Sequence, residues 1–230
     1  MLQQTPVERV LKKYRLFVKI FPEFSSLAGA SLNEILTVWQ GLGYNRRAIS
    51  LRKIAETIVT KFDSKLPSSE KDLIELPGIG RYTAAALVAF VHNRPSVIIE
   101  TNIRTVYIHF FFKNEKHVKD TDIIPLIRRT LDRINPREWY YALMDYGAML
   151  KKEYIHVGRR SAHYRRQTPF HGSHRQKRGM ILRLLIRKPG LSQKEITMHI
   201  GLQPEKAEKT LKELQDEGFL KVKRKKYFVA

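Results

Sequence analysis

Apolar residues recur at helical spacing along much of this chain, with polar and basic residues between them. The first such segment runs from Val7 to Ile20, so one face of that helix is predicted to be core and the other basic. The pattern repeats over Phe24 to Gln40, where Ser31 is a plausible N-cap and Glu34 its capping-box partner. Another helix is predicted from Arg46 to Lys61. The N-terminal third is therefore expected to be a helical array.

The middle of the chain continues the helical pattern. A short helix is expected from about residue 67 to Leu76, and three more are expected at residues 104–112, 120–134 and 137–150. Val97 to Ile99 is compatible with a short strand on periodicity alone. The whole region is predicted to be mainly α.

A glycine-containing turn precedes an Ala-rich apolar run at Tyr82 to Val91. Pro77, Gly78 and Gly80 make a turn that side chains at those positions are expected to obstruct. Backbone N–H groups at such a turn, beside the positive end of a helix dipole, can hold a phosphate. We therefore predict that residues 77–81, which are Pro77, Gly78, Ile79, Gly80 and Arg81, contact a nucleic-acid backbone. The alternative is an ordinary turn between two helices.

Residues 174–230 show a separate pattern of three helices followed by a hairpin. The first helix ends at Pro189, Ser192 caps the second, and Pro204 begins the third. Two short apolar strands joined by basic residues follow Gly218. This order resembles a winged helix-turn-helix domain, with the third helix in the recognition position. DNA and protein both remain possible partners, because that helix carries acidic residues among its lysines.

Charge narrows the class of partner. The chain has 43 Lys and Arg against 22 Asp and Glu, a net charge of +21 and a pI near 10.2. Such a balance is typical of proteins that bind polyanions, including nucleic acid, ribosomes and membrane surfaces. No apolar run reaches the length of a membrane span, and the first ten residues do not read as a signal peptide. We expect a cytoplasmic, nucleoid-associated monomer that has no membrane partner.

The basic residues are densest between residues 151 and 188. We interpret residues 151–173 as a basic linker that lies on phosphate, and its predicted DNA-binding residues are Lys151, Lys152, Arg159 and Arg160. A solvated basic loop is the alternative. The chain contains no Cys, which excludes disulfides, Cys-ligated zinc and Cys-ligated iron–sulfur clusters. The spacing of the eight His matches no metal template, so no metal and no cofactor are predicted.

Several motifs in one order resemble the helix-hairpin-helix (HhH-GPD) DNA glycosylases, and the adenine-specific MutY type most. The resemblance covers roughly residues 1–150 and is highly specific for the family. Its motifs are Met1 to Val7, Trp39 to Tyr44 with Arg47 and Ala48, Leu76 to Ala86 with Ile98 to Val106, and Ala142 to Met149. It implies a helical glycosylase domain at 1–150, followed by the linker at 151–173 and the winged helix at 174–230. It also implies that Val97 to Glu100 is an extended lead-in to a helix near Asn102.

A glycosylase must flip its target base out of the duplex and fill the gap. The resemblance offers Gln4 and Tyr44 as intercalating and strand-contacting residues, and it places Gln3 and Arg47 with them on the DNA. Tyr44 as a half-buried loop aromatic is the alternative.

The resemblance places a catalytic carboxylate at Glu100. Breaking an N-glycosidic bond builds positive charge on the sugar, which a carboxylate beside C1′ stabilises. Asn102 is expected to orient this carboxylate or the attacking water. Tyr82 occupies the position at which bifunctional relatives such as endonuclease III carry a Schiff-base lysine. Because tyrosine cannot form that imine, the resemblance implies a monofunctional enzyme with Tyr82 lining the base pocket. The alternatives are a helix-start acid for Glu100 and plain packing for Tyr82.

The sequence departs from the family pattern at three places. The family has Asp where this chain has Glu100. The MutY type supplies a general acid from a Glu two residues before the motif that starts here at Met1. We expect that acid, and the N-terminal helix that precedes the motif in the family, to be encoded upstream; the alternative is that this protein lacks the acid and depends on other chemistry. The four-Cys cluster loop expected after Met149 is replaced by Lys151, Lys152 and the basic tract.

These observations predict a base-excision DNA repair glycosylase. The expected substrate is double-stranded DNA with a mismatched or damaged base, and the expected base is adenine opposite guanine or 8-oxoguanine. The alternatives are a catalytically impaired DNA-binding protein of this fold, a mismatch thymine or uracil glycosylase and, from the tail alone, a transcriptional regulator.

Overall fold

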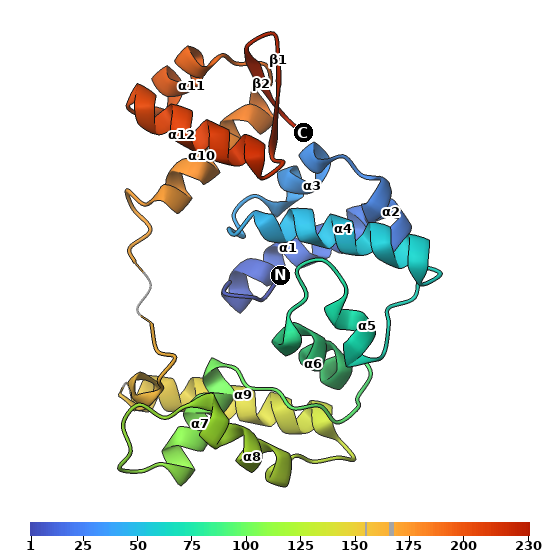
Figure 1. Cartoon of the computed structure of the whole chain (residues 1–230), viewed down its shortest axis with the longest axis vertical. Helices are drawn as coiled ribbons and strands as arrows, with labels where there is room; N and C mark the ends of the chain where they lie inside the picture. Colours follow the sequence, from blue (N-terminus) through green and yellow to red (C-terminus); the bar gives the residue numbers. More distant parts are fainter. Residues whose placement is uncertain (155, 166–167) are drawn as a thin grey trace. The chain divides into compact units, whose positions relative to one another are not determined.

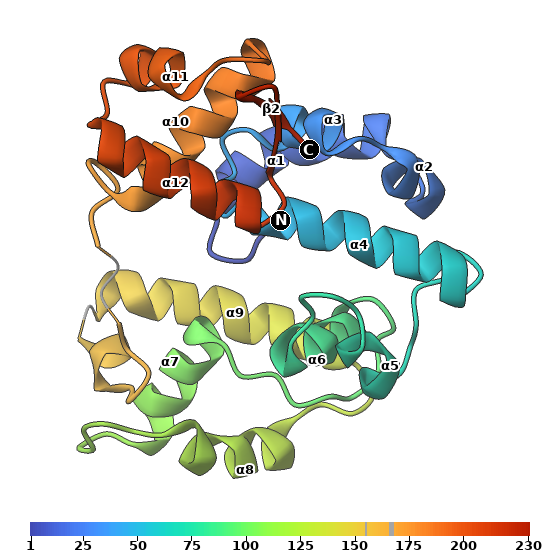
Figure 2. The same ribbon diagram turned by 45° about the horizontal axis from the view of Figure 1, so that its top comes forward.

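The computed structural model describes residues 1–154, 156–165 and 168–230, and the chain divides into two compact units (Figures 1 and 2). The first unit combines Met1–Leu66 with Thr168–Ala230. The second unit is Pro67–Gln167. The predicted mainly helical fold is confirmed, and only one two-stranded sheet occurs in the described residues.

Four helices make up the N-terminal part of the first unit: α1 (Val7–Ile20), α2 (Phe24–Gly29), α3 (Leu32–Trp39) and α4 (Arg46–Lys61). The helix pattern over Phe24 to Gln40 is interrupted, since Ala30 and Ser31 are extended. Ser31 begins α3 with the predicted capping box: its hydroxyl accepts from the Glu34 N–H, and the Glu34 carboxylate accepts from the Ser31 N–H at 2.8 Å. The sequence pattern hid this break because α2 and α3 both bury leucines in one core.

The C-terminal part of the first unit has the predicted order of three helices and a hairpin. These elements are α10 (His174–Arg187), α11 (Gln193–Ile200), α12 (Pro204–Asp216), β1 (Leu220–Lys223) and β2 (Lys226–Val229). The strands are antiparallel, with Leu220 opposite Val229. Arg224 and Lys225 form the turn at φ 48° and 59°, a region that few non-glycine residues adopt. A basic wing tip therefore follows α12.

The winged helix shares one hydrophobic core with α1–α4. Phe17 and Trp39 belong to the same buried cluster as Ile181, Leu185 and Phe219. The helices α3 and α10 contact each other and both contribute residues to this core, and Figures 1 and 2 show them side by side. Residues 174–230 are thus a distinct pattern in the sequence but part of a larger compact unit in space. The domain boundaries at residues 150 and 173 stay predictions.

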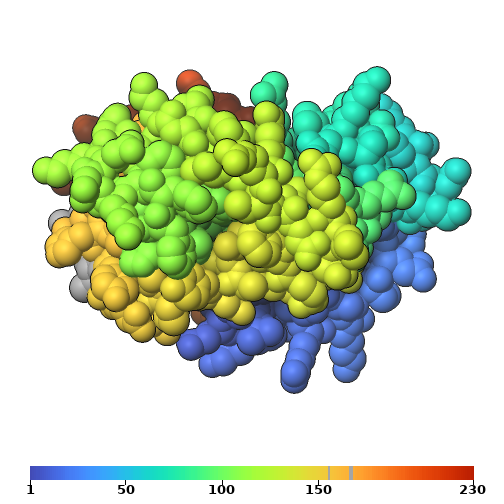
Figure 3. Space-filling model, turned by 90° about the horizontal axis from the view of Figure 1, so that it is seen from below, coloured from blue at the N-terminus to red at the C-terminus, as the bar shows by residue number. Residues whose placement is uncertain are grey.

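The second unit contains α5 (Glu70–Ile74), α6 (Arg81–Phe90), α7 (Thr101–Phe111), α8 (Asp120–Thr130), α9 (Pro136–Glu153) and the 3-10 helix η1 (Val157–Arg160). Figure 3 shows the face of this unit that α8 and α9 cover. Its core includes Ile98, Ile103 and Tyr140, all fully buried. The Tyr140 hydroxyl donates to the Ser96 carbonyl at 2.7 Å and accepts from the Ile98 N–H at 3.0 Å. These bonds hold the extended segment that leads into α7.

Several helix boundaries in the second unit differ from expectation. The helix predicted from about residue 67 to Leu76 covers only Glu70–Ile74, and the helix predicted at residues 104–112 runs from Thr101 to Phe111. The helix predicted to reach Ile134 ends at Thr130, because the Asp132 carboxylate accepts from the N–H groups of Ile134 and Asn135 and turns the chain. The helix predicted to end at Leu150 continues to Glu153.

The start of the predicted linker is packed in the second unit. The η1 helix contacts α7, and the Val118 segment exchanges two backbone hydrogen bonds with Arg160 and Ala162, each 2.8 Å. These contacts order part of the segment that was interpreted from the sequence as a linker, with a solvated loop as the alternative. Ile155, Arg166 and Gln167 of the predicted linker lie outside the described residues.

Candidate active site and nucleic-acid interface

The predicted turn joins α5 to α6. The Ile79 N–H donates to the Leu76 carbonyl at 3.0 Å, and Gly78 has φ +80°, which glycine adopts without strain. Gly80 is the N-cap of α6 with φ −89°, and a Cβ there would meet no atom within 4 Å. A side chain at Gly80 would not clash with any other part of the described protein, so the expected obstruction at this position is wrong. Without a side chain at Gly80, the first turn of α6 has no side-chain cap.

Glu100 is the N-cap of α7. Its Oε1 accepts from the N–H groups of Asn102 and Ile103, at 2.5 and 2.8 Å. The sequence analysis treated a helix-start role and a catalytic role for Glu100 as alternatives. The two roles are compatible, because the hydrogen bonds that cap the helix also fix the position of the carboxylate. Oε2 has no hydrogen-bond donor among the residues that the structure describes. This oxygen is the one available to a reacting group.

Lys151 reaches the same site from the C-terminal end of α9. Its Nζ donates to the Asn102 Oδ1 at 2.5 Å, across 49 positions of sequence. Burial lowers the pKa of Lys151, the charge of Glu100 partly offsets this, and the charge of Arg104 lowers the pKa further. The sequence suggested phosphate contact for Lys151, whereas the structure directs its ammonium to Asn102. Nothing in the sequence could indicate this pairing, which depends on how α9 packs against α7.

A glycine allows that packing. A Cβ at Gly147 of α9 would lie 2.3 Å from the Asn102 carbonyl oxygen and 2.8 Å from the Asn102 Cβ. Both atoms belong to the first turn of α7, so no side chain fits between the two helices here. The glycine within the predicted 142–149 motif therefore sets how close Lys151 comes to Asn102.

Tyr82 lies in the first turn of α6 with 41% of its surface exposed. Burial raises the pKa of its hydroxyl, and the negative charge of Glu100 raises it further. The phenol is therefore protonated at neutral pH and available as a hydrogen-bond donor beside the carboxylate. Tyr82, Glu100, Asn102 and Lys151 are brought together in the second unit.

An ion pair that the sequence did not indicate braces α7 just after this site. The Arg104 guanidinium donates to both Asp120 carboxylate oxygens, at 2.6 and 2.8 Å. His163 Nε2 is 3.6 Å from the same carboxylate. The pair joins the first turns of α7 and α8, so it stabilises the position of the Glu100 cap.

Four of the predicted DNA-contacting residues, Gln3, Gln4, Tyr44 and Arg47, lie in the first unit, where Arg47 organises two loops. Its charged group lies 5.4 Å from the ring centres of both Trp39 and Tyr44. It is therefore a positioning residue, and DNA contact by Arg47 stays a prediction. Its guanidinium donates, at 2.6 to 3.3 Å, to the carbonyls of Met1, Gln3, Leu42 and Gly43 and to the hydroxyl of Thr5.

Gln4 and Tyr44, the predicted intercalating residues, both have left-handed backbones. Their φ angles are 55° and 47°, which cost a non-glycine residue on the order of 1 kcal/mol or more. Gln3, Gln4 and Tyr44 are all exposed, with Tyr44 at 38%. Arg47 holds the loops that carry them, so the structure maintains these conformations through specific contacts.

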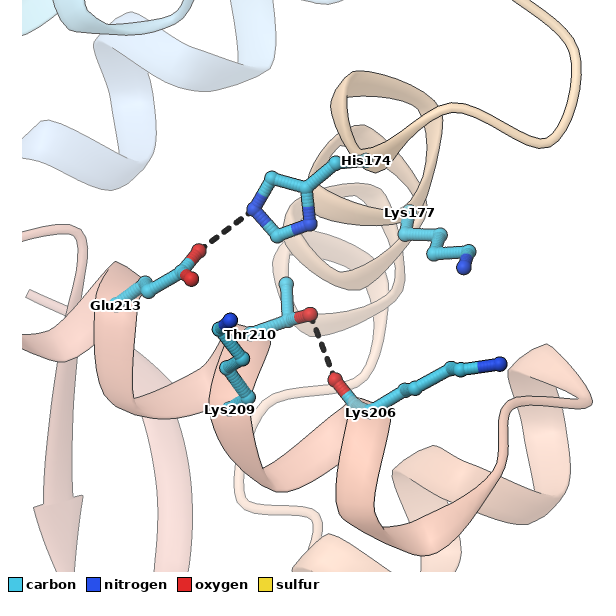
Figure 4. A pocket seen from close by; sticks show the side chains of 6 residues that line it. All are labelled: His174, Lys177, Lys206, Lys209, Thr210 and Glu213. Carbon is cyan, nitrogen blue, oxygen red and sulfur yellow. Dashed lines mark hydrogen bonds and ion pairs between the residues drawn. The ribbon is translucent and has the colours of Figure 1, made fainter.

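The winged helix carries a basic groove between α10 and α12 (Figure 4). Glu213 is the single carboxylate among the lining residues. Its Oε2 lies 2.6 Å from His174 Nε2 and 3.6 Å from Arg178 Nη1. The groove therefore presents net positive charge. In Figure 4, Lys177 of α10 and Lys206 of α12 extend toward the same side. The lining residues are His174, Lys177, Lys206, Lys209, Thr210 and Glu213.

The remaining predicted phosphate contacts lie in the last turn of α9 and in η1. Lys152 and Arg159 are exposed. Arg160 is half-buried, and its Nε donates to the Glu115 carbonyl at 2.8 Å. Lys152 and Arg159 thus keep the exposure that phosphate binding needs, while Arg160 also helps to order the chain.

The residues do not fit an iron–sulfur cluster. Such clusters need thiolate ligands, and the chain has no Cys. At the place where the family carries its cluster loop, Leu150 is buried and Lys151 bonds Asn102. Within the described ranges, no group of three or more His, Asp or Glu could hold a metal ion. No helix in those ranges is long and apolar enough to cross a membrane.

The turn between α5 and α6 and the capped carboxylate at the start of α7 are the two features that the sequence motifs assigned to a DNA base-excision protein. The chain belongs to the HhH-GPD superfamily of base excision DNA repair proteins, whose family model matches residues 1–125, more than half of the chain. A winged helix-turn-helix DNA-binding model matches residues 175–221. Both resemblances inferred from the motifs are thereby confirmed.

Curated relatives of the chain are adenine DNA glycosylases. That of Buchnera aphidicola subsp. Baizongia pistaciae is 37% identical over 154 residues, which are 65% of this chain and 43% of the relative. That of Mycolicibacterium smegmatis is 40% identical over 106 residues, or 46% and 36% of the two chains. The chain spans less than half the length of these relatives.

Solved structures show the same fold at lower identity. A thermostable thymine-DNA glycosylase has a TM-score of 0.58 at 23% identity, with 64% of this chain and 70% of that chain covered. An endonuclease III trapped as a covalent intermediate with DNA has a TM-score of 0.53 at 17% identity, with 74% and 73% covered.

Proposed function

We propose that this protein removes adenine mispaired with guanine or 8-oxoguanine from double-stranded DNA by hydrolysing its N-glycosidic bond. The observation that carries the proposal is the Glu100 carboxylate, which the first turn of α7 holds beside Tyr82 and Asn102. The adenine DNA glycosylases among the relatives support adenine as the base. The net charge of +21 supports DNA as the partner.

Each residue has a defined part in the proposed reaction. The C1′–N9 bond breaks, its electron pair leaves with the adenine, and the departing base takes up a proton. The Glu100 carboxylate stabilises the positive charge that develops on the sugar, and water adds to C1′ and loses a proton. Asn102, whose side chain Lys151 holds, orients the water or the carboxylate. Tyr82 lines the base pocket, and its protonated hydroxyl donates a hydrogen bond there.

The proposed enzyme is monofunctional. A lyase step requires an amine that forms an imine with C1′ of the sugar, and Tyr82 occupies the place at which bifunctional members of the family carry that amine. We therefore expect free adenine and an intact abasic strand as products. Strand breakage should require added alkali, and borohydride should trap no covalent complex.

Single-turnover excision tests the role of Glu100. Duplexes with adenine opposite guanine or 8-oxoguanine would be incubated with the parent, Glu100→Gln and Glu100→Asp proteins. Glu100→Gln should abolish excision and leave binding intact, since the amide keeps the shape but loses the charge. Glu100→Asp should keep or raise the rate, because its carboxylate lies roughly 1.5 Å closer to the backbone, and misplacement of about 1 Å can cost on the order of a hundredfold. Equal rates for the parent and Glu100→Gln would disprove the assignment.

A DNA-binding protein with impaired chemistry is the second candidate function. It is favoured by one observation: the longer Glu100 side chain folds back onto its own helix, with Oε1 accepting two backbone N–H groups. This alternative predicts mismatch-specific binding without excision by the parent or by Glu100→Asp. The excision assay above therefore distinguishes the two candidates.

A further inference from the structure

The winged helix contacts the loop that carries Tyr44. Arg175, the second residue of α10, donates from Nη1 to the Tyr44 hydroxyl at 3.3 Å. Its Nη2 donates to the Thr168 carbonyl at 2.8 Å. Arg175 is thereby fixed between the backbone that enters α10 and the end of the Tyr44 side chain. All of these residues belong to the first unit.

A second contact fixes the chain just after Tyr44. Glu217, at the end of α12, accepts from Arg46 at 2.9 Å and from both terminal nitrogens of Arg178, at 2.9 and 2.5 Å. The side chains of Arg178 and Glu217 are only 18% and 19% exposed. Arg46 begins α4, two residues after Tyr44. The paired α10 and α12 thus bind the base of the loop as well as its tip.

The core beneath the loop is also shared. Trp39 donates from Nε1 to the Gly43 carbonyl at 3.1 Å, and Trp39 lies in the cluster that includes residues of α10 and α12. Arg47 lies over the Tyr44 ring, while Arg175 bonds its hydroxyl. Contacts at both ends of the side chain thus set the direction of Tyr44.

We propose that the winged helix positions Tyr44 through Arg175 and so contributes to the discrimination between mismatched and fully paired DNA. Arg175 is a positioning residue that acts through Tyr44 and has no direct part in catalysis. The inference rests on the proposed function and on the prediction from the sequence that Tyr44 contacts the DNA strand. Its structural part, the Arg175–Tyr44 contact, can be measured without DNA.

A double-mutant cycle tests the proposal. The variants are Arg175→Met, Tyr44→Phe and the two combined, with Arg183→Met, an exposed arginine of the same helix, as the matched control. The readout is the ratio of dissociation constants for a matched duplex and for one with uncleavable 2′-fluoro-2′-deoxyadenosine opposite 8-oxoguanine. Each single variant should lower the ratio about threefold to tenfold, the range for one hydrogen bond. The combined variant should lower it no further.

Independent effects in the cycle would overturn the proposal. If Arg175→Met lowers the ratio equally in the Tyr44→Phe background, Arg175 acts without Tyr44. If Arg175 instead binds a phosphate, Arg175→Met should reduce the slope of log K against log salt by about one unit on matched DNA, whereas a positioning role leaves the slope unchanged.

A measurement without DNA separates this inference from the proposed function. With 3-fluorotyrosine at position 44, Arg175→Met should shift the ¹⁹F resonance and Arg183→Met should not. An unmoved resonance refutes the contact, whatever the activity. If Arg175→Met shifts the resonance but the parent protein does not prefer mismatched DNA, then the contact exists and both the role in discrimination and the proposed function are refuted.

Discussion

At the scale of single residues, the site depends on side chains that restrain one another. The carboxylate of Glu100 is held by backbone N–H groups, and the amide of Asn102 is held by Lys151. Preorganisation of this kind matters because a reacting group misplaced by about 1 Å can lose on the order of a hundredfold in rate. Lys151 is therefore expected to act on catalysis more than on DNA affinity.

Replacing Lys151 tests that expectation. Lys151→Met keeps the length of the side chain and removes the donor to Asn102, so single-turnover excision should slow by about tenfold to a hundredfold. Lys152→Met is the matched control, since Lys152 is the adjacent lysine and is exposed. The control should leave the excision rate within about twofold, because surface changes are usually small. If both variants slow excision equally, the loss of a positive charge explains the effect and the hydrogen bond to Asn102 does not.

At the scale of elements, close approach of two helices sets the site. Gly147 lets α9 contact the first turn of α7, and Arg104 with Asp120 holds that turn to α8. The site is thus built at the beginning of α7 by its neighbours.

Gly147→Ala should disturb this arrangement. The added methyl group would lie 2.3 Å from the Asn102 carbonyl oxygen, and overpacking of this kind typically costs about 1–3 kcal/mol. Gly179→Ala in α10 is the control, because a Cβ there meets no atom within 4 Å. That change should stabilise the protein by about 0.5–1 kcal/mol. Thermal unfolding would measure both, and a Gly147→Ala protein as stable as the parent would contradict the close approach.

At the scale of the whole molecule, two separate stretches of chain make up the first unit. Residues 168–230 contribute Ile181, Leu185 and Phe219 to the core that contains Trp39. Deleting the tail would therefore expose this core as well as remove basic charge. Point substitutions are the informative way to test what the winged helix binds.

Acid should weaken the attachment of the winged helix. Burial alone would raise the pKa of Glu217, but hydrogen bonds and charges from Arg46 and Arg178 outweigh it and lower the pKa. This stabilisation is present above the unfolded pKa of Glu, near 4.3, and is lost as pH falls through the lower folded pKa. Glu217→Gln should cost about 2 kcal/mol at pH 7. Below about pH 4 the parent and Glu217→Gln should differ less in their free energies of unfolding. Unfolding curves measured from pH 7 to pH 3 would show this.

The groove of Figure 4 predicts a change in salt dependence. If it lies on DNA, Lys177→Gln with Lys209→Gln should flatten log K against log salt by about one unit for each lost phosphate contact. Affinity should fall alike for matched and mismatched duplexes, because phosphate contacts carry no sequence information. An unchanged slope would mean that the groove faces a different partner.

Local patterns in the sequence were enough to predict the helices, the family and the order of elements in the winged helix. Spacing of apolar residues and local caps are short-range signals, so α1, α4 and the Ser31 box were predicted where they occur. The Glu100 carboxylate and the hairpin turn were likewise recognisable, because their residues are contiguous. Whether Glu100 and Tyr82 act as proposed stays a prediction until excision is measured.

Contacts between residues far apart in the sequence became visible only in the folded chain. The contacts of Lys151 with Asn102, Arg175 with Tyr44 and Arg46 with Glu217 cross 49, 131 and 171 positions of sequence. The break between α2 and α3 and the sharing of one core by α1–α4 and the winged helix also depended on packing. The physical reason is that helical periodicity indicates which face of a helix is buried but not what covers it. Long basic side chains add no local signal that distinguishes a phosphate ligand from a carboxylate or amide partner.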